Sequence, residues 1–136
     1  MKVRDLFKKY QMGTTIWSPL ESGILTGKYI NGIPDDSRYK IDHDNSKVNI
    51  QAYLDNKKEW DEKLLTLKDI AKKKFNFSLT QLVIAFIIVN TDCSTTLLRA
   101  IKASYLEETI KTVEIYKKLN KSSLVEIEKI LGNNPV

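Results

Sequence analysis

Residues Thr14–Arg38, TTIWSPLESGILTGKYINGIPDDSR, decide the fold expected for this chain. The stretch begins with β-branched and aromatic residues, which favour a short strand over Thr14–Trp17. Pro19 prevents the strand from extending, and glycines punctuate the residues that follow. A lysine, a turn over Ile33–Asp36 and an arginine complete the stretch. We therefore predict a buried strand that leads into a loop suited to an anionic ligand.

We expect a short helix before this stretch, and a polar loop followed by a longer helix after it. Val3–Tyr10 carries apolar residues at positions i, i+3, i+4 and i+7, which predicts a short amphipathic helix that ends before Gly13. Tyr39–Asn49 is polar, and we expect a mobile loop there. Apolar residues then return at helical spacing, and a helix is expected over Lys57–Lys74.

A buried helix and a second strand are expected next. Ser78, with Thr80 and Gln81 close behind it, offers N-capping chemistry for a helix. The body of this helix is apolar on all sides, which indicates burial on more than one face. A short buried strand is expected over Thr95–Leu98. Because strand–helix–strand order favours parallel pairing with a right-handed crossover, we expect the two strands to pair in parallel.

Two further helices are expected to end the chain. A long helix is predicted over Ala103–Leu119, and the last helix is predicted to begin at a Ser122 or Ser123 cap and to stop at Gly132. Two short strands cannot form a closed core, since a parallel pair needs covered faces and neighbours at both edges. The residues alone therefore predict an incomplete α/β fold, mostly helical, with two short parallel strands.

Charge and composition argue against several functions. The net charge of +5 comes from lysines mixed with glutamates, which is typical of solvated helix faces rather than of a nucleic-acid platform. No run of about 18 apolar residues exists in the sequence, so we expect no membrane-spanning helix. A single cysteine, Cys93, cannot form an internal disulfide and favours a reducing, cytoplasmic setting. His43 has no second histidine with it, and we predict no metal site.

Four segments together resemble the aldo-keto reductase family, in particular the beta subunits of voltage-gated potassium channels: WSPLESGILTGKY, IPDDSR, SLTQLVIAF and EIEKILGNNP. The resemblance covers nearly all of residues 1–136, in order. It implies a TIM (β/α)8 barrel that binds NADP(H) at the C-terminal ends of its strands, with the two strands here as the seventh and eighth. The chain would be the C-terminal part of that domain. The family's catalytic Asp, Tyr, Lys and His lie in earlier parts of the barrel, so no catalytic residue is expected here.

The resemblance assigns cofactor binding to nine residues. Four match the family's contact residues directly, and two occupy contact positions where the family varies. A lysine matches the family's phosphate-facing lysine, and an arginine matches the family's arginine near the adenosine end. A glutamate in the predicted helix after the second strand is also retained. In that order, the residues are Trp17, Ser18, Pro19 and Leu20, then Glu21 and Ser22, then Lys28 and Arg38, and finally Glu108. Without the resemblance, plain surface charge is the better explanation of Lys28 and Arg38; with it, cofactor binding becomes the better one.

The segment after the second strand departs from the family pattern. Arg99 takes the position of a glycine, and Ile101 takes that of a phosphate-binding serine. Tyr105 and Thr109 replace a glutamine and an asparagine. Loss of one binding group typically costs about 1–3 kcal/mol, so we expect weakened NADP(H) binding. Arg99 or Lys102 could instead pair with the 2′-phosphate.

Three functions remain open at this stage. The chain is part of a reductase whose complete form reduces carbonyls by hydride transfer from NADPH, or a regulatory channel-associated subunit, or a degenerate fragment with only a packing role. The expected partners are a voltage-gated potassium channel or further copies of the chain. Self-association is expected because the strands carry open edges and the apolar helix should expose four side chains, namely Leu82, Ile84, Phe86 and Ile87.

Overall fold

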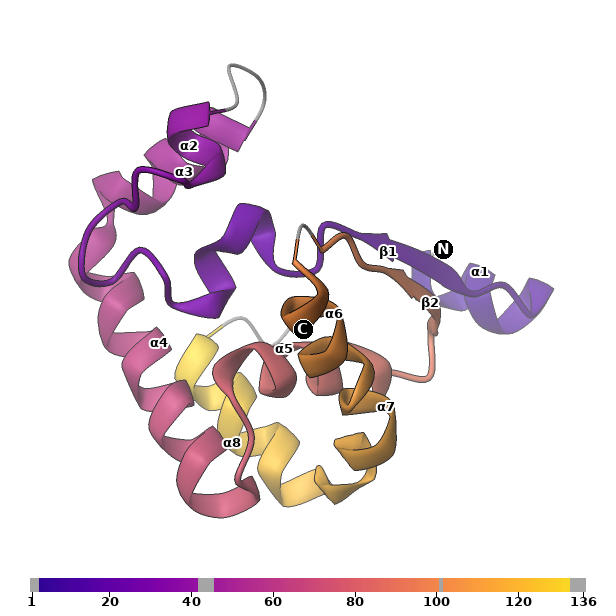
Figure 1. The fold of residues 1–136 in the computed structure, drawn as a ribbon. Helices are drawn as coiled ribbons and strands as arrows, with labels where there is room; N and C mark the ends of the chain where they lie inside the picture. Colours follow the sequence, from indigo (N-terminus) through magenta and orange to yellow (C-terminus); the bar gives the residue numbers. More distant parts are fainter. Residues whose placement is uncertain (1–2, 42–45, 101, 133–136) are drawn as a thin grey trace.

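The computed structural model describes residues 3–41, 46–100 and 102–132. A pair of parallel strands extends from a group of helices, with the first helix at the far end of the pair (Figure 1). Strand β1 spans Thr14–Trp17, as predicted, and β2 spans Cys93–Leu97, so it begins two residues before the predicted start. The predicted parallel pairing is confirmed, with Thr15 opposite Thr95 and Trp17 opposite Leu97.

Most of the described chain is helical. Two short 3-10 helices and one π-helical turn interrupt or join the α-helices. In chain order the helical elements are α1 (Val3–Tyr10), η1 (Glu21–Thr26), α2 (Arg38–Ile41), α3 (Ser46–Asp55), α4 (Lys57–Ile70), η2 (Ala71–Phe75), α5 (Leu79–Ile88), α6 (Ala103–Ile110), α7 (Thr112–Ile115), η3 (Tyr116–Lys118) and α8 (Lys121–Leu131).

The expectation of a mobile loop over Tyr39–Asn49 is wrong for the residues that the structure describes. Helix α2, which begins at Arg38, covers the first residues of this range, and the backbone carbonyl of Ser37 accepts hydrogen bonds from the amides of Lys40 and Ile41. Helix α3 begins within this range, and it is anchored because its apolar residues further along lie in the core. Residues 42–45, which include His43, lie outside the described residues.

The cap predictions fare differently at the two helices they concern. Ser78 and Gln81 form a capping box at the start of α5, as predicted. The cap of α8 is not a serine but Asn120, whose side-chain oxygen accepts a hydrogen bond from the Ser123 amide at 3.0 Å. Gly132 ends α8 in a left-handed conformation, as predicted.

The long helix predicted over Ala103–Leu119 is wrong as a continuous element. The helix is interrupted at Lys111, between α6 and α7, and its last turn is the 3-10 helix η3. Near the break, the hydroxyl of Thr109 donates to the carbonyl of Leu106 at 2.9 Å. Such bonds from threonine to the preceding turn compete with the regular helical ladder, which gives a physical reason for the break. At the other predicted long helix, α4 ends at Ile70 and continues as the π-helical turn η2.

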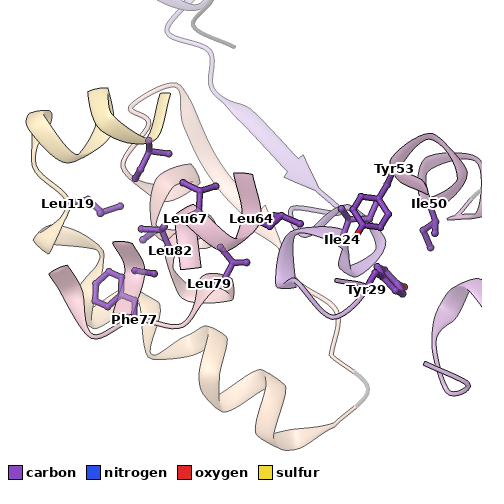
Figure 2. Packing of buried hydrophobic residues seen from close by; sticks show 13 residues of the cluster. Ile24, Tyr29, Ile50, Tyr53, Leu64, Leu67, Phe77, Leu79, Leu82 and Leu119 are labelled. Carbon is purple, nitrogen blue, oxygen red and sulfur yellow. The ribbon is translucent and has the colours of Figure 1, made fainter. Parts of the chain in front are cut away.

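The core lies between α4, α5 and α8 and extends to the loop after β1. Figure 2 shows Leu64 and Leu67 of α4 beside Leu79 and Leu82 of α5, with Leu119 near them. The prediction that the apolar helix exposes its faces is wrong for Leu82 and Ile84, which are buried, while Phe86 and Ile87 are partly buried. The reason is that α4, α6 and α7 all pack against α5.

A second part of the core fixes the loop that follows β1. Ile24 of η1 and the fully buried Tyr29 pack beside Ile50 and Tyr53 of α3 (Figure 2). The two tyrosine rings lie 6.3 Å apart with a tilt of 45°. The loop is therefore attached to the helices by large buried side chains.

In the described ranges, no helix is long and apolar enough to cross a membrane.

Candidate functional site

The backbone after β1 adopts an unusual run of left-handed conformations. Ser18 has a φ of 52°, Glu21 has a φ of 46°, and Ser22 has a φ of 54°. Each such conformation costs about 1–3 kcal/mol in a residue with a side chain, so three within five residues mark a loop that its surroundings hold in place. All three belong to the predicted cofactor residues. Gly23 continues the run with a φ of 94°.

Specific hydrogen bonds maintain this loop. The amide of Glu21 donates to the carbonyl of Ser18 at 2.9 Å, and the amide of Gly23 donates to that of Leu20 at the same distance. From the core, the hydroxyl of Tyr29 donates to the carbonyl of Ser22 at 3.1 Å. The side-chain amide of Asn49 donates to the carboxylate of Glu21. The carboxylate of Glu21 is thus engaged by α3.

Lys28 lies directly against this loop. Its ammonium nitrogen stands 2.7 Å from the point where a Cβ atom on Gly23 would lie, so the lysine fills the space that a larger residue would occupy. The same ammonium group is 4.9 Å from the centre of the Tyr29 ring. The structure therefore brings the Lys28 side chain together with Gly23 of the loop. A cation and a constrained loop are the components that a phosphate site needs.

Trp17 does not lie in the core. Its side chain is 79% exposed at the end of β1, opposite the exposed Leu97 of β2. The prediction of a buried strand is wrong at Trp17, because this side chain faces outward on the strand pair. Ser18, Pro19 and Leu20 are partly buried in the turn that follows. The prediction of Trp17 as a neighbour of the cofactor stays a prediction.

The adenosine-side residues come from two further elements. Arg38 is the first residue of α2; its side chain lies outside what the structure describes. Glu108 lies on α6, where its backbone carbonyl accepts a hydrogen bond from the side chain of Gln81 at 3.2 Å. The structure thus ties Glu108 to α5. Arg99 is exposed after β2, and Ile101 lies outside the described residues.

An ion pair that the sequence did not reveal joins these elements. The ammonium group of Lys102, which precedes α6, lies 4.0 Å from the carboxylate of Asp36. Asp36 is two residues before Arg38, so the pair brings the turn before α2 toward the start of α6. Next to it, Ser37 is buried, and its hydroxyl forms no hydrogen bond within the described part of the chain. No signal in the sequence links positions that lie 66 residues apart.

A polar network supports the outer side of the loop. The ammonium group of Lys57 donates to the carbonyl of Ile30 at 2.8 Å and also pairs with the carboxylate of Asp61. The hydroxyl of Tyr53 donates to the same carboxylate. Burial, followed by the neighbouring Asp61 carboxylate, raises the pKa of Tyr53 well above its ordinary value. Helices α3 and α4 are thereby attached to the residues that follow Lys28.

One cavity lies away from the predicted cofactor residues. Among the described residues, no group of three or more histidine, cysteine or acidic side chains could hold a metal ion. A cavity of about 280 Å³ lies between β2, α5 and the helices α6 and α7, and it is lined by apolar side chains, threonines and Cys93. None of the nine predicted cofactor residues lines it.

A strand whose C-terminal end leads into a lysine-bearing loop, beside a second parallel strand that leads toward a helix, is typical of parallel α/β proteins with sites at their strand ends. Comparison with known families agrees with this class. Residues 1–131 match the model of the Aldo/keto reductase family, and the chain belongs to that family. The family implies a TIM-barrel fold, of which two parallel strands and their helices fit one part.

The similar curated proteins point to one branch of the family. The chain is 35% identical over 98% of its length to a protein of Schizosaccharomyces pombe named "Putative voltage-gated potassium channel subunit beta". Proteins of Oryza sativa subsp. japonica and Arabidopsis thaliana, both named "Probable voltage-gated potassium channel subunit beta", are each 34% identical over 96% of the chain. The chain spans 40% of the first relative and 38% of the other two, or about two fifths of their length.

Proposed function

We propose that this chain supplies part of the NADP(H)-binding groove of an aldo-keto reductase domain. The observation that carries the proposal is the position of the Lys28 ammonium group against Gly23, in the loop of left-handed residues that follows β1. A positive charge in the loop after a parallel strand supports a phosphate site there, because such loops carry the ligand sites of parallel α/β proteins. The matched family makes a nicotinamide dinucleotide the expected ligand.

The residues present fit such a ligand. The backbone of Leu20 to Gly23 and the ammonium group of Lys28 would hold the pyrophosphate, and Trp17 offers an exposed ring beside them. Arg38 and Lys102 would hold the phosphate at the adenosine end, as planar and point-like cations respectively. When bound, NADPH supplies a hydride for carbonyl reduction. The residues of this chain bind and orient NADPH. The catalytic group is proposed to lie outside residues 1–136, and the protein that contains the domain is proposed to be cytoplasmic.

Titration with NADPH tests the proposal. A Trp60→Phe background leaves Trp17 as the fluorescent reporter at the site, since the sequence has two tryptophans. We expect saturable quenching of Trp17 emission and a Kd that rises about tenfold or more in Lys28→Gln, because a charge-assisted phosphate contact contributes roughly 1.5–3 kcal/mol. Lys68→Gln, an exposed lysine on α4, serves as the matched control and should leave the Kd unchanged.

The proposal fails if the protein with Trp60→Phe shows no saturable NADPH binding by fluorescence and calorimetry. It also fails if Lys68→Gln weakens binding as much as Lys28→Gln does, because binding would then follow net charge alone. A cooperative thermal transition in each variant is required in both cases. An expanded protein without such a transition would support the hypothesis of a degenerate fragment with only a packing role.

A second proposal concerns the partner. The three relatives described above are named as potassium channel beta subunits, and this favours a channel-associated role for the protein to which the chain corresponds. Co-purification with a voltage-gated potassium channel from the same cell would support it. A protein that binds NADPH and never co-purifies with such a channel would contradict it. Self-association through the open edges of β1 and β2 stays a prediction, and sedimentation would test it.

A further inference from the structure

Exposed lysines gather at one end of the group of helices, on η2, on η3 and on the first turn of α8. The six residues are Lys72, Lys73, Lys74, Lys117, Lys118 and Lys121. We call these six residues the lysine surface. Because the net charge of the whole chain is +5, six lysines on one surface are a strong local concentration of positive charge.

Contacts between distant segments bring the six lysines together. The ammonium group of Lys74 lies 2.5 Å from the carboxylate of Glu126, which joins η2 to α8. The ammonium group of Lys118 in η3 lies 5.7 Å from the centre of the Phe77 ring, which follows η2. In Figure 1, the segment after α4 and the segment before α8 meet at the lower edge of the molecule. The lysines of both segments are therefore presented on the same side.

Acidic side chains neutralise only part of the charge of the lysine surface. Lys73 pairs with Asp69 at 2.7 Å, and Lys74 pairs with Glu126. Within the described part of the chain, four lysines of the surface form no ion pair, namely Lys72, Lys117, Lys118 and Lys121. Like charges that gather on one surface repel one another, and an anionic partner that approaches them relieves this repulsion.

Stabilisation of the helices does not explain all six lysines. A cation is favoured at the C-terminal end of a helix, and Lys72, Lys73 and Lys74 follow α4 at such an end. Lys121, however, is the first residue of α8, where the positive end of the helix dipole disfavours a cation. A shared anionic partner gives a reason for this lysine that the helix itself does not give.

An extended anionic surface fits these lysines better than a small ligand or a nucleic acid does. All six are exposed and come from three elements, so they can contact one broad partner together. The neighbouring aromatic rings offer no platform for stacked bases, because Phe77 is buried and Phe75 is half-buried. Clusters of about four to eight basic residues are typical of proteins that bind anionic lipid headgroups.

We propose that the lysine surface docks the protein on an anionic membrane, through headgroups with the charge of phosphatidylserine. The attraction is electrostatic, and each lysine near the membrane surface strengthens partitioning roughly fivefold. Docking of this kind needs no helix that enters the membrane. The proposal goes beyond nucleotide binding and does not depend on it, since none of the six lysines is among the predicted cofactor residues.

Sedimentation with lipid vesicles tests the proposal. The full chain is mixed with vesicles of phosphatidylcholine alone, or of phosphatidylcholine with about 30% phosphatidylserine, and the bound fraction gives a partition coefficient. We expect binding to the anionic vesicles only, and release when the salt concentration rises from about 0.1 M to about 0.5 M. The double variant Lys72→Gln, Lys121→Gln removes one cation from η2 and one from α8, and it should weaken partitioning about twentyfold.

The double variant Lys8→Gln, Lys58→Gln is the matched control, because it removes the same charge from exposed lysines on α1 and at the start of α4. It should change partitioning less than about twofold, since exposed charges away from the contact are screened. The proposal is overturned if the unsubstituted protein binds no anionic vesicles or binds both kinds equally, or if the control weakens partitioning as much as the test variant does. Binding of single-stranded RNA through the lysine surface, without binding of vesicles, would overturn it as well. All four substitutions change exposed side chains, and unaltered thermal transitions establish that each variant is folded.

Discussion

Replacing Gly23 with alanine should damage both the stability of the chain and its nucleotide site. Gly23 has a φ of 94°, a conformation that side-chain-bearing residues rarely adopt, and an alanine there costs about 1–2 kcal/mol. The new Cβ would also lie 2.7 Å from the Lys28 ammonium nitrogen, which is too close for two atoms that are not bonded. Because a lysine side chain is flexible, we expect it to move away at little further cost. The site then loses its cation although no ligand group has been deleted.

Two measurements separate these effects. Urea unfolding should show a free energy of unfolding lower by about 1–2 kcal/mol, and NADPH titration should show a Kd higher by about tenfold. Gly132→Ala is the control, since Gly132 has a φ of 68° and open space where the Cβ would lie. It should lose a similar stability and leave the Kd unchanged. The Gly23→Ala, Lys28→Ala double variant should bind no more weakly than Lys28→Ala, because both changes remove the same contact.

The reasoning is refuted if Gly23→Ala unfolds at the same urea concentration as the unsubstituted protein, since the backbone strain would then be absent. It is equally refuted if Gly132→Ala weakens NADPH binding as much as Gly23→Ala does. In that case the loss of affinity would follow general destabilisation and not the position of Lys28. A double variant that binds tenfold more weakly than Lys28→Ala would show that the loop itself had been displaced.

Two further predictions concern stability. The pKa of Tyr53 is raised in the folded protein, whereas in the unfolded chain a tyrosine has its ordinary pKa near 10. Above about pH 10 the unfolded chain therefore loses a proton that the folded protein keeps. The stability that this hydroxyl contributes is present below about pH 10 and declines as the pH rises above it. Unfolding by urea between pH 8 and 11 should show this decline, and Tyr53→Phe should reduce its slope. At α8, Asn120→Ala should cost about 1 kcal/mol and Ser122→Ala should cost almost nothing; equal losses would contradict the assignment of Asn120 as the cap.

The local features of the fold were accessible from the sequence. Strand β1 followed from β-branched residues closed by Pro19, and the α5 capping box followed from Ser78 and Gln81, because in both cases neighbouring residues determine the conformation. The Asn120 cap was missed since an asparagine and two serines compete within four positions for the same role. Helices α2 and α3 were missed because their polar sequence forms helices only when residues such as Ile50 and Tyr53 pack into the core.

The features of the candidate site also fall into those that the sequence predicted and those that only the structure revealed. The family pattern in the sequence singled out Lys28, but its contact with Gly23, five positions away, came from the structure. The exposure of Trp17 could not be predicted, because it depends on which face of the strand pair the helices cover. The pairing of Asp36 with Lys102 joins segments that meet only after β1 and β2 have paired. Contacts of that kind follow from tertiary structure, and a pattern of residue types does not contain them.

The proposed site has two parts that come from distant segments of the chain. One part follows β1 and carries Lys28, and the other precedes α6 and carries Lys102, so the pairing of β1 with β2 helps to set the distance between their cations. The described pair keeps Trp17 beside Leu97 but includes a register irregularity near Thr14, at the end away from the site. In the proposed site, a shift at the Trp17 end would move the ammonium groups of Lys28 and Lys102 relative to each other, so a two-part nucleotide site would depend on the register there.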